Sequence, residues 1–259
     1  MTGRPSTDQS IDKEFMSTFA RGLELIRSFD TETPAMTLSA VAEKNGLSRA
    51  AARRYLLTLL KLGYVSQDDK TFRLTAKVLE LGYSYLASLD FTETITPIME
   101  KVSYRLGESC SALVLDGTDI VYVVRIPRRG LIPINLQIGA RLPAYATSGG
   151  RVLMSALPDT ELDDLLDRTS FDRLTAYTKD RQGLVAELEQ IRSNGYAIVD
   201  QELELGMRAL AVPVFDRRGQ TRFALNTSSH VSTVSVQRII DEYVPILQEA
   251  SRRITDVLP

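Results

Sequence analysis

The first third of the chain carries apolar residues at helical spacing, and the clearest repeat lies between residues 37 and 62. Thr37 is a favourable N-cap, and the apolar residues after it recur at the i, i+3, i+4 spacing that forms one helical face. Asn45-Gly46 tolerates the positive φ found just past a helix end, and Ser48 can cap a second helix two residues later. The pattern therefore predicts a helix, a tight turn and a second helix.

The second of these helices has one apolar and one basic face. The apolar face consists of Ala52, Tyr55, Leu56 and Leu59. The opposite side carries Ala50, Arg53, Arg54 and Lys61, with Arg49 on the flank. Small residues let a helix approach the major groove of DNA, and guanidinium groups reach guanine edges or phosphates. We therefore expect DNA contacts from Ser48, Arg49, Ala50, Arg53 and Arg54, although basic residues alone would also suit a solvated surface helix.

Flanking segments extend this unit. Residues 1–14 are polar without periodicity and are expected to form a disordered tail. From Phe15 the pattern becomes helical, and a three-helix core is predicted in which the first helix packs through Phe19, Leu23, Ile26 and Phe29.

Residues 64–75 place strand-forming residues on either side of Gln67-Asp68-Asp69-Lys70, which predicts a short hairpin. Such a hairpin would be the wing of a winged helix-turn-helix domain. Lys70 and Arg73 would then lie near the DNA backbone and position the domain without reading sequence. An ordinary solvent-facing hairpin is the alternative for either residue taken singly.

Two amphipathic helices are predicted after the wing. Thr75 can cap a helix over residues 76–89 that has two apolar stripes, which favours more than one packing partner. We interpret this helix as a linker between domains and a dimer contact; an ordinary core helix is the alternative. A helix over residues 91–107, ending at Gly107, opens the second domain.

The remaining pattern predicts one antiparallel sheet covered by helices. Apolar runs at 111–115 and 119–126 flank Asp116-Gly117-Thr118, which is typical of a hairpin. Further strands are predicted within 131–138 and at 196–199, 209–215 and 222–227, and helices at 149–157, 159–167, 183–193 and 233–257. The fold class is therefore α+β, in two domains.

Charge divides the chain in the same way. Residues 44–77 hold eight Lys or Arg against Asp68 and Asp69, a local charge of +6, whereas the whole chain carries −2 and the remainder therefore −8. A basic module on an acidic body suits the exchange of phosphate counterions.

The single Cys110 excludes an internal disulfide and fits a reducing compartment. Without a signal peptide or an apolar run of roughly 18 residues, a cytoplasmic protein with no membrane partner is expected.

Several motifs together resemble one family. The segment GLSRAAARRYLLTLLKLGYV, the predicted wing, LPAYATSGGRVLMSALP and GYAIVDQELELGMRALAVPVFDRRG resemble the IclR family of bacterial transcriptional regulators, over about residues 15–258. The resemblance implies a winged helix-turn-helix at 15–75, a linker helix at 76–90 and a GAF-like effector-binding domain at 91–259. It also implies a dimer or dimer of dimers that binds a palindromic double-stranded DNA operator and a small organic acid.

Within the family, residues 125–157 are most similar to the Pca and Pob type, which regulate aromatic-acid breakdown through the β-ketoadipate pathway. Effectors there are protocatechuate, 4-hydroxybenzoate, β-ketoadipate or close relatives. Matching motifs carry the family's effector positions onto Leu142, Ser148, Gly149, Met207, Ala209, Asn226 and Ser228. A helix that begins at Ser148-Gly149 offers unpaired N–H groups to a ligand carboxylate. Small 2-oxoacid binders have an acidic residue in place of Val199 and a serine in place of Asn226, which disfavours those ligands.

Other polar residues near these motifs have simpler interpretations. The nearest cations are Arg125, Arg128, Arg129, Arg141 and Arg151, most of which are expected on the surface. His230 is expected at the pocket rim or in a surface loop. The carboxylate pairs Asp163-Asp164 and Glu202 with Glu204 are interpreted as solvated faces.

The sequence does not favour an enzyme. One histidine, one cysteine and no phosphate-binding glycine motif leave little for catalysis, so no catalytic residue, cofactor or metal site is expected. Two alternatives stay open: an IclR-type regulator of another small-acid pathway, and a DNA-binding protein whose C-terminal domain binds a protein partner.

Overall fold

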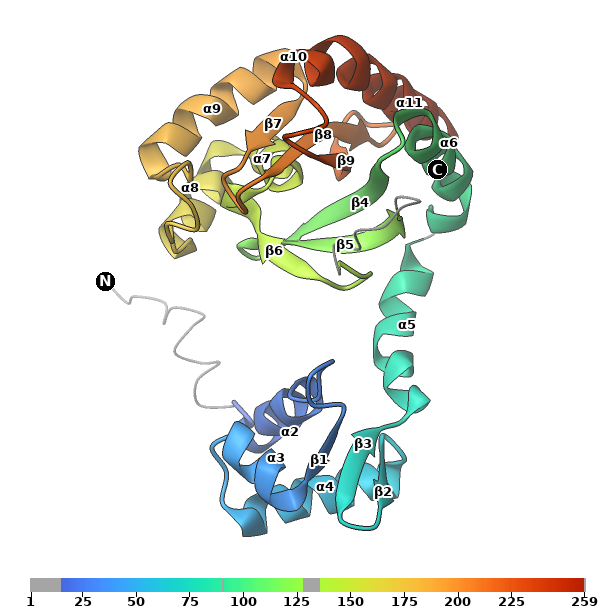
Figure 1. The fold of residues 1–259 in the computed structure, drawn as a ribbon, viewed down its shortest axis with the longest axis vertical. Coiled ribbons are helices and arrows are strands. Elements are labelled where there is room, and N and C mark those ends of the chain that lie inside the picture. The colour runs from blue at the N-terminus through green and yellow to red at the C-terminus, as the bar shows by residue number, and fades with distance from the viewer. Residues whose placement is uncertain (1–14, 90, 128–135, 259) are drawn as a thin grey trace, which may run out of the picture. The chain divides into compact units, whose positions relative to one another are not determined.

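The computed structural model describes residues 15–89, 91–127 and 136–258, and the chain divides into two units between Ser88 and Leu89 (Figure 1). The predicted tail at 1–14 and most of the strand predicted within 131–138 lie outside the described residues. No helix in the described ranges is long and apolar enough to cross a membrane.

The first unit contains the predicted helix-turn-helix and hairpin. Its elements are α2 (Ser17–Arg27), β1 (Ala35–Thr37), α3 (Leu38–Lys44), α4 (Arg49–Leu62), β2 (Val65–Asp68), β3 (Thr71–Leu74), the 3₁₀ turn η1 (Ala76–Val78) and α5 (Leu79–Ser88). The side chain of Thr37 accepts a hydrogen bond from the N–H of Ala40, and that of Ser48 from the N–H of Ala51. Both predicted N-caps are therefore confirmed.

Helices α2, α3 and α4 share one core, and the predicted face of α2 is confirmed for Ile26 and Phe29 but wrong for Phe19 and Leu23. Leu25 is fully buried, whereas Phe19 and Leu23 are 66% and 42% exposed. The reason is Gly22, which lies on the side of α2 that meets the ring of Tyr55 on α4. The larger Phe19 and Leu23 are consequently turned away from the core.

The hairpin of β2 and β3 is extended by a strand that the sequence pattern did not reveal. Strand β1 pairs antiparallel with β3, so the sheet order is β1-β3-β2. Three residues are too few to show a strand periodicity, and Thr37 ends the strand while capping α3.

In its described residues, the second unit is a six-stranded antiparallel sheet between helices, in the order β6-β5-β4-β9-β8-β7. Its strands are β4 (Ser109–Asp116), β5 (Asp119–Ile126), β6 (Arg141–Pro143), β7 (Ala197–Asp200), β8 (Met207–Phe215) and β9 (Thr221–His230). Its helices are α6 (Thr92–Leu106), the 3₁₀ turn η2 (Ala144–Ala146), α7 (Ser148–Ser155), α8 (Asp159–Arg168), α9 (Arg181–Asn194), α10 (Val236–Arg238), the π-helical turn η3 (Ile239–Tyr243) and α11 (Val244–Val257).

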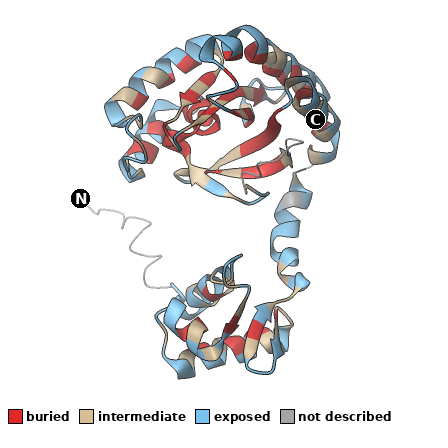
Figure 2. Cartoon of the chain, viewed as in Figure 1, coloured by how far each residue is buried: buried red, intermediate tan, exposed pale blue. Residues whose placement is uncertain are grey.

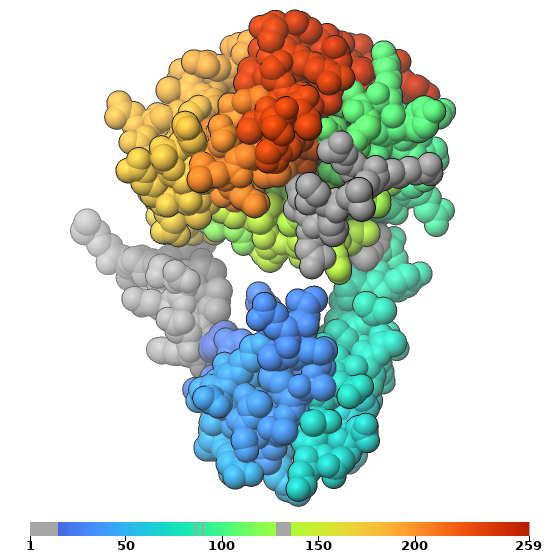
Figure 3. All heavy atoms as spheres, viewed as in Figure 1, coloured from blue at the N-terminus to red at the C-terminus, as the bar shows by residue number. Residues whose placement is uncertain are grey.

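Each face of this sheet packs against its own helices. Helices α6 and α11 form one apolar core with one face, and α7, α8 and α9 form a second core with the other. Figure 2 shows buried residues along the strands and the inner helical faces. In the space-filling view, α9 to α11 in orange and red lie across the top of this unit, with α6 in green beside them (Figure 3).

One strand of the second unit was not predicted, and one predicted helix differs from the structure. Strand β6 pairs with β5 and was not predicted, whereas the strand predicted within 131–138 lies mostly outside the described residues and stays a prediction. The single closing helix predicted at 233–257 begins at Val236 and is interrupted by the π-helical turn before α11. Pro245 stands in the first turn of α11 and has no N–H to donate, which favours an interruption at this point.

Helix α7 is buried along its whole length because two glycines bring its backbone against its neighbours. A Cβ on Gly149 would lie 2.3 Å from Cδ1 of Leu113 in β4, and one on Gly150 would lie 2.1 Å from the carbonyl oxygen of Ala144. These contacts fix the position of the α7 N-terminus under the sheet.

The reactivity of Cys110 in β4 tests how tightly the core of the sheet is packed. Its side chain is fully buried in the core, and burial raises the pKa of its thiol well above the ordinary value. Because the thiolate is the nucleophile, we expect the native protein to leave a disulfide reagent such as dithionitrobenzoate unreacted, and the urea-unfolded chain to react with one equivalent. Rapid reaction of the native protein would contradict this packing.

Candidate DNA-binding helix and effector cavity

Helix α4 presents its basic side chains together on one exposed face. Ser48 caps the helix, and Arg49, Ala50, Arg53 and Arg54 are all exposed. The opposite face is buried through Ala52, Leu56 and Leu59. Within the described ranges none of the three arginines forms an ion pair, so their guanidinium groups are available to phosphates and base edges.

Hairpin β2–β3 presents Lys70 and Arg73, which are likewise exposed. Its turn is fixed locally: Asp69 has a φ of 50°, and its carbonyl oxygen accepts a hydrogen bond of 2.8 Å from Nε2 of Gln67. A hairpin held in this way can place the positively charged side chains of Lys70 and Arg73 beside a DNA backbone without contacting the bases.

The second unit contains a small cavity on the sheet face that packs against α7. Its volume is about 70 Å³, several times the roughly 10–15 Å³ that one water molecule needs. Six of the seven predicted effector residues line it: Leu142, Ser148, Met207, Ala209, Asn226 and Ser228. Gly149 does not line it, because the side chain of Leu113, which does line the cavity, packs against the Cα of Gly149.

Strand pairing explains why residues distant in sequence meet at this cavity. Met207 and Ala209 alternate along β8 with the buried Arg208 and Leu210, whose side chains lie on the other face of the sheet. Ala209 is directly opposite Ser228 in β9. Motif matching found these positions, but it missed the lining contributed by Ile120 and Tyr122 of β5 and by the loop of Leu203 and Glu204.

One end of the cavity is polar and the remainder is mainly apolar. Nδ2 of Asn226 donates to Oγ of Ser148 at 2.9 Å and to the carbonyl oxygen of Leu210 at 3.1 Å. Thr147 caps α7 by accepting from the N–H of Gly150. The hydroxyl of Ser228 lies 3.4 Å from that of Ser109. Hydroxyls and a helix N-terminus thus converge where an acid group of a ligand would be stabilised.

Among the described lining residues there is no Lys, Arg or His, and Glu204 is acidic. Arg125 lies beside the cavity: its guanidinium carbon is 5.8 Å from the ring centre of Tyr122, and Nη1 donates to Oγ of Ser111 at 3.2 Å. Burial lowers the pKa of Arg125, although an arginine remains charged at neutral pH.

The other predicted polar residues have different environments. Arg141 is partly exposed and pairs with Asp116 and Asp119. Exposed His230 contacts the hydroxyl of Ser232. Arg128 and Arg129 lie outside the described residues.

Two of the interpretations from sequence are wrong. Arg151 is fully buried, and Glu202 is only 5% exposed, because the two side chains form an ion pair inside the second unit. Glu204 and the Asp163-Asp164 pair are exposed as expected. The described residues contain no cluster of His, Cys, Asp or Glu that could hold a metal ion.

A larger groove of about 800 Å³ lies elsewhere on the second unit, near Pro158, Phe215 and Arg222. It is open to solvent, and Arg192 on its wall is already paired with Asp159 and with the carbonyl oxygen of Ser155. The smaller, more enclosed cavity is therefore the better candidate for ligand binding.

Comparison with known proteins agrees with the fold of the two units. Residues 18–69 match the IclR helix-turn-helix domain, and residues 83–256 match the C-terminal domain of bacterial transcriptional regulator IclR. The chain belongs to the IclR family of bacterial transcriptional regulators. This IclR-family protein is thus a DNA-binding regulator, and the family resemblance from sequence is confirmed.

Individual relatives support the same conclusion. The Pca regulon regulatory protein of Pseudomonas putida is 40% identical over 243 residues, which cover 93% of this chain and 84% of the relative. The crystal structure of a putative transcriptional regulator from Rhodococcus sp. RHA1 is 44% identical, with a TM-score of 0.82 over 93% of this chain and 98% of that one.

A third relative carries a ligand. It is the inducer-binding domain of a PobR double mutant from Acinetobacter, solved as a complex with 3-hydroxybenzoic acid. That domain is 30% identical, with a TM-score of 0.61 over 64% of this chain and 98% of its own. The resemblance to the Pca and Pob type is therefore confirmed.

Proposed function

We propose that this IclR-family protein controls aromatic-acid catabolic genes, and that a small aromatic monocarboxylic acid bound in the cavity changes its affinity for an operator. The observation that carries the proposal is the cavity itself, in which Ser148 and Asn226 meet at the N-terminus of α7 between apolar walls. The similarity to a domain solved with 3-hydroxybenzoic acid supports the same class of ligand.

The lining favours one negative charge over two. A single carboxylate can take hydrogen bonds from the α7 N-terminus and nearby hydroxyls, while a ring packs against Tyr122, Leu142 and Met207. A second carboxylate would enter an apolar region next to Glu204, where desolvation and like charge both oppose it. We therefore expect hydroxybenzoates to bind more tightly than the dicarboxylate β-ketoadipate.

We further propose that the active form is a dimer, or a dimer of dimers, on a palindromic operator. Two copies of α4 would then enter successive major grooves. For ligand to regulate DNA binding, it must bind one arrangement of the dimer better than another, because equal affinity for both would change nothing.

A thermal titration tests ligand binding. The melting temperature is recorded with 3-hydroxybenzoate, 4-hydroxybenzoate, protocatechuate and β-ketoadipate, with 4-hydroxybenzamide as the uncharged control. An acid present at about 100 times its dissociation constant should stabilise the native state by roughly 2.7 kcal/mol. The amide should give a much smaller shift, since it lacks the carboxylate. The absence of a shift with every acid would contradict the proposed ligand class.

A further inference from the structure

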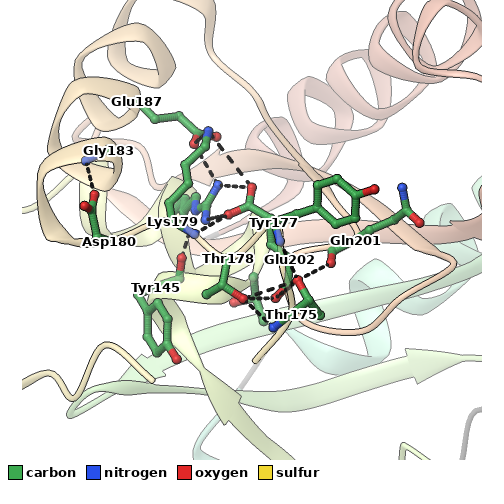
Figure 4. A network of polar contacts seen from close by, with 12 residues as sticks. Tyr145, Thr175, Tyr177, Thr178, Lys179, Asp180, Gly183, Glu187, Gln201 and Glu202 are labelled. Atoms are coloured by element: carbon green, nitrogen blue, oxygen red, sulfur yellow. Dashed lines mark hydrogen bonds and ion pairs between the residues drawn. The ribbon is translucent and has the colours of Figure 1, made fainter. Parts of the chain in front are cut away.

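Arg151 is the most deeply buried charged side chain near the cavity, yet it does not line the cavity. It lies in α7, one turn after Ser148, and is 0% exposed. Figure 4 shows a polar network that brings together Glu187 of α9, the segment of residues 175–180 and Glu202 of the loop that connects β7 with β8. Arg151 of α7 bonds to both glutamates.

Every nitrogen of the Arg151 guanidinium donates to an oxygen. Nη1 and Nη2 bond to the two carboxylate oxygens of Glu202 at 2.9 and 2.6 Å. Nη1 also bonds to Glu187 of α9 at 2.7 Å, and Nε bonds to the carbonyl oxygen of Tyr145 at 2.8 Å. Burial disfavours the charge on Arg151, but the two glutamates outweigh this effect and raise its pKa. The planar fork of an arginine suits this bidentate pairing, which a lysine could not reproduce.

Glu202 belongs to the β7–β8 loop, residues 201–206, which supplies part of the cavity wall through Leu203 and Glu204. The backbone of Glu202 is anchored as well, because its carbonyl oxygen accepts a hydrogen bond of 2.7 Å from the hydroxyl of Thr178. Its carboxylate also accepts from the N–H of Lys179 at 3.1 Å.

The loop is held in an unusual backbone conformation. Gln201, directly before Glu202, has a φ of 60°, which few residues other than glycine adopt. Such a conformation persists only where the surroundings enforce it, and such sites cluster at ligand clamps. The N–H of Gln201 donates to the carbonyl oxygen of Met207 at 2.7 Å, so the loop closes on a residue that itself lines the cavity.

We propose that Arg151 and Glu202 are positioning residues for the effector, since their ion pair sets the separation between two walls of the cavity. One wall is the segment from Ala146 to Ser148, which directly follows Tyr145, whose carbonyl oxygen accepts from Arg151. The other is the loop of Leu203 and Glu204. This inference rests on the proposed function, in that the cavity is taken to bind an aromatic acid.

Energetics favour a positioning role over a purely stabilising one. A buried ion pair rarely adds stability over apolar residues of the same volume, because desolvation of both charges offsets their attraction. What the pair does provide is a fixed geometry between α7 and the loop.

The test compares Glu202→Gln with Glu187→Gln. Each variant removes one carboxylate charge from Arg151, but only Glu202 belongs to the cavity loop. Titration calorimetry with 4-hydroxybenzoate should give a dissociation constant at least about tenfold higher for Glu202→Gln, and one within about threefold of the wild type for Glu187→Gln. Equal loss in the two variants, or no loss in Glu202→Gln, would overturn the proposal. If 4-hydroxybenzoate does not bind the wild type, 3-hydroxybenzoate or protocatechuate replaces it.

Hydrogen exchange of the ligand-free proteins separates this inference from the proposed function. The amides of Gln201 and Gly206, both hydrogen-bonded within the loop, should exchange at least about tenfold faster in Glu202→Gln and unchanged in Glu187→Gln. This result would stand even if no acid bound the wild type, whereas unchanged exchange would overturn the proposal. If Glu202→Gln does not fold, Arg151→Lys, which keeps a buried positive charge but loses the bidentate pairing with Glu202, is measured in its place, with the same two outcomes.

Discussion

Replacing Arg53 and Arg54 together by alanine is expected to abolish sequence-specific DNA binding. Both side chains are exposed on the face of α4 that points away from the core, and neither pairs with a described acid. Each single substitution should weaken operator binding by about 1–3 kcal/mol if its guanidinium reads a base. The operator is first selected from a random duplex pool with the wild-type protein, and affinities are then measured by fluorescence anisotropy.

Two further variants calibrate this experiment. Lys70→Ala should weaken binding mildly and to a similar extent for all DNA sequences. The slope of log affinity against log salt concentration should fall by about the contribution of one phosphate contact. Arg252→Ala, which removes an exposed arginine from α11 in the second unit, should leave binding unchanged. Unaltered operator affinity in both single arginine variants of α4 would refute the assignment of this face.

Gly150→Ala is expected to unfold the second unit or to leave it marginally stable. The added Cβ would lie 2.1 Å from the oxygen and 2.4 Å from the Cα of Ala144, and a backbone on both sides of the contact cannot yield as a side chain can. Overpacked cores cost about 1–3 kcal/mol and occasionally more, and this contact belongs at the upper end. The measurement is urea unfolding followed by circular dichroism.

Two other glycines provide matched controls for that measurement. Gly149→Ala should cost less, because the nearest atom is the end of the flexible Leu113 side chain. Gly82→Ala in α5 meets nothing within 4 Å and should be neutral or stabilise by up to about 1 kcal/mol, since alanine favours helix. A Gly150→Ala protein as stable as the Gly82→Ala protein would contradict the close packing of α7.

Local signals in the sequence predicted the elements that depend on local chemistry. Thr37 and Ser48 cap helices as their residue types indicate, and the hairpin turn lies at Asp69-Lys70 between the predicted strands. Matching the motifs of the resembled family also located six cavity-lining positions, and Ala209 and Ser228 among them lie directly opposite each other in β8 and β9.

Features that depend on tertiary contacts could not be predicted from the sequence. Periodicity did not show that Phe19 and Leu23 face solvent, because the approach of Gly22 to Tyr55 on the other side of α2 is a tertiary contact. Arginine is ordinarily a surface residue, so the burial of Arg151 follows only from its pairing with Glu202, 51 positions away. The cavity loop was missed for the same reason, since nothing local marks it as a wall.

The most direct test is the operator affinity of the wild-type protein measured across a titration with 4-hydroxybenzoate. Ligand control of DNA binding corresponds to a coupling free energy of about 1–3 kcal/mol between the two binding sites, so operator affinity should change by roughly 5–150-fold. The acid concentration at which half of this change occurs should be governed by the affinity of the protein for the acid. The uncharged 4-hydroxybenzamide should leave operator affinity unchanged. Operator affinity that stays constant while calorimetry shows the acid to be saturating would contradict the proposed regulation.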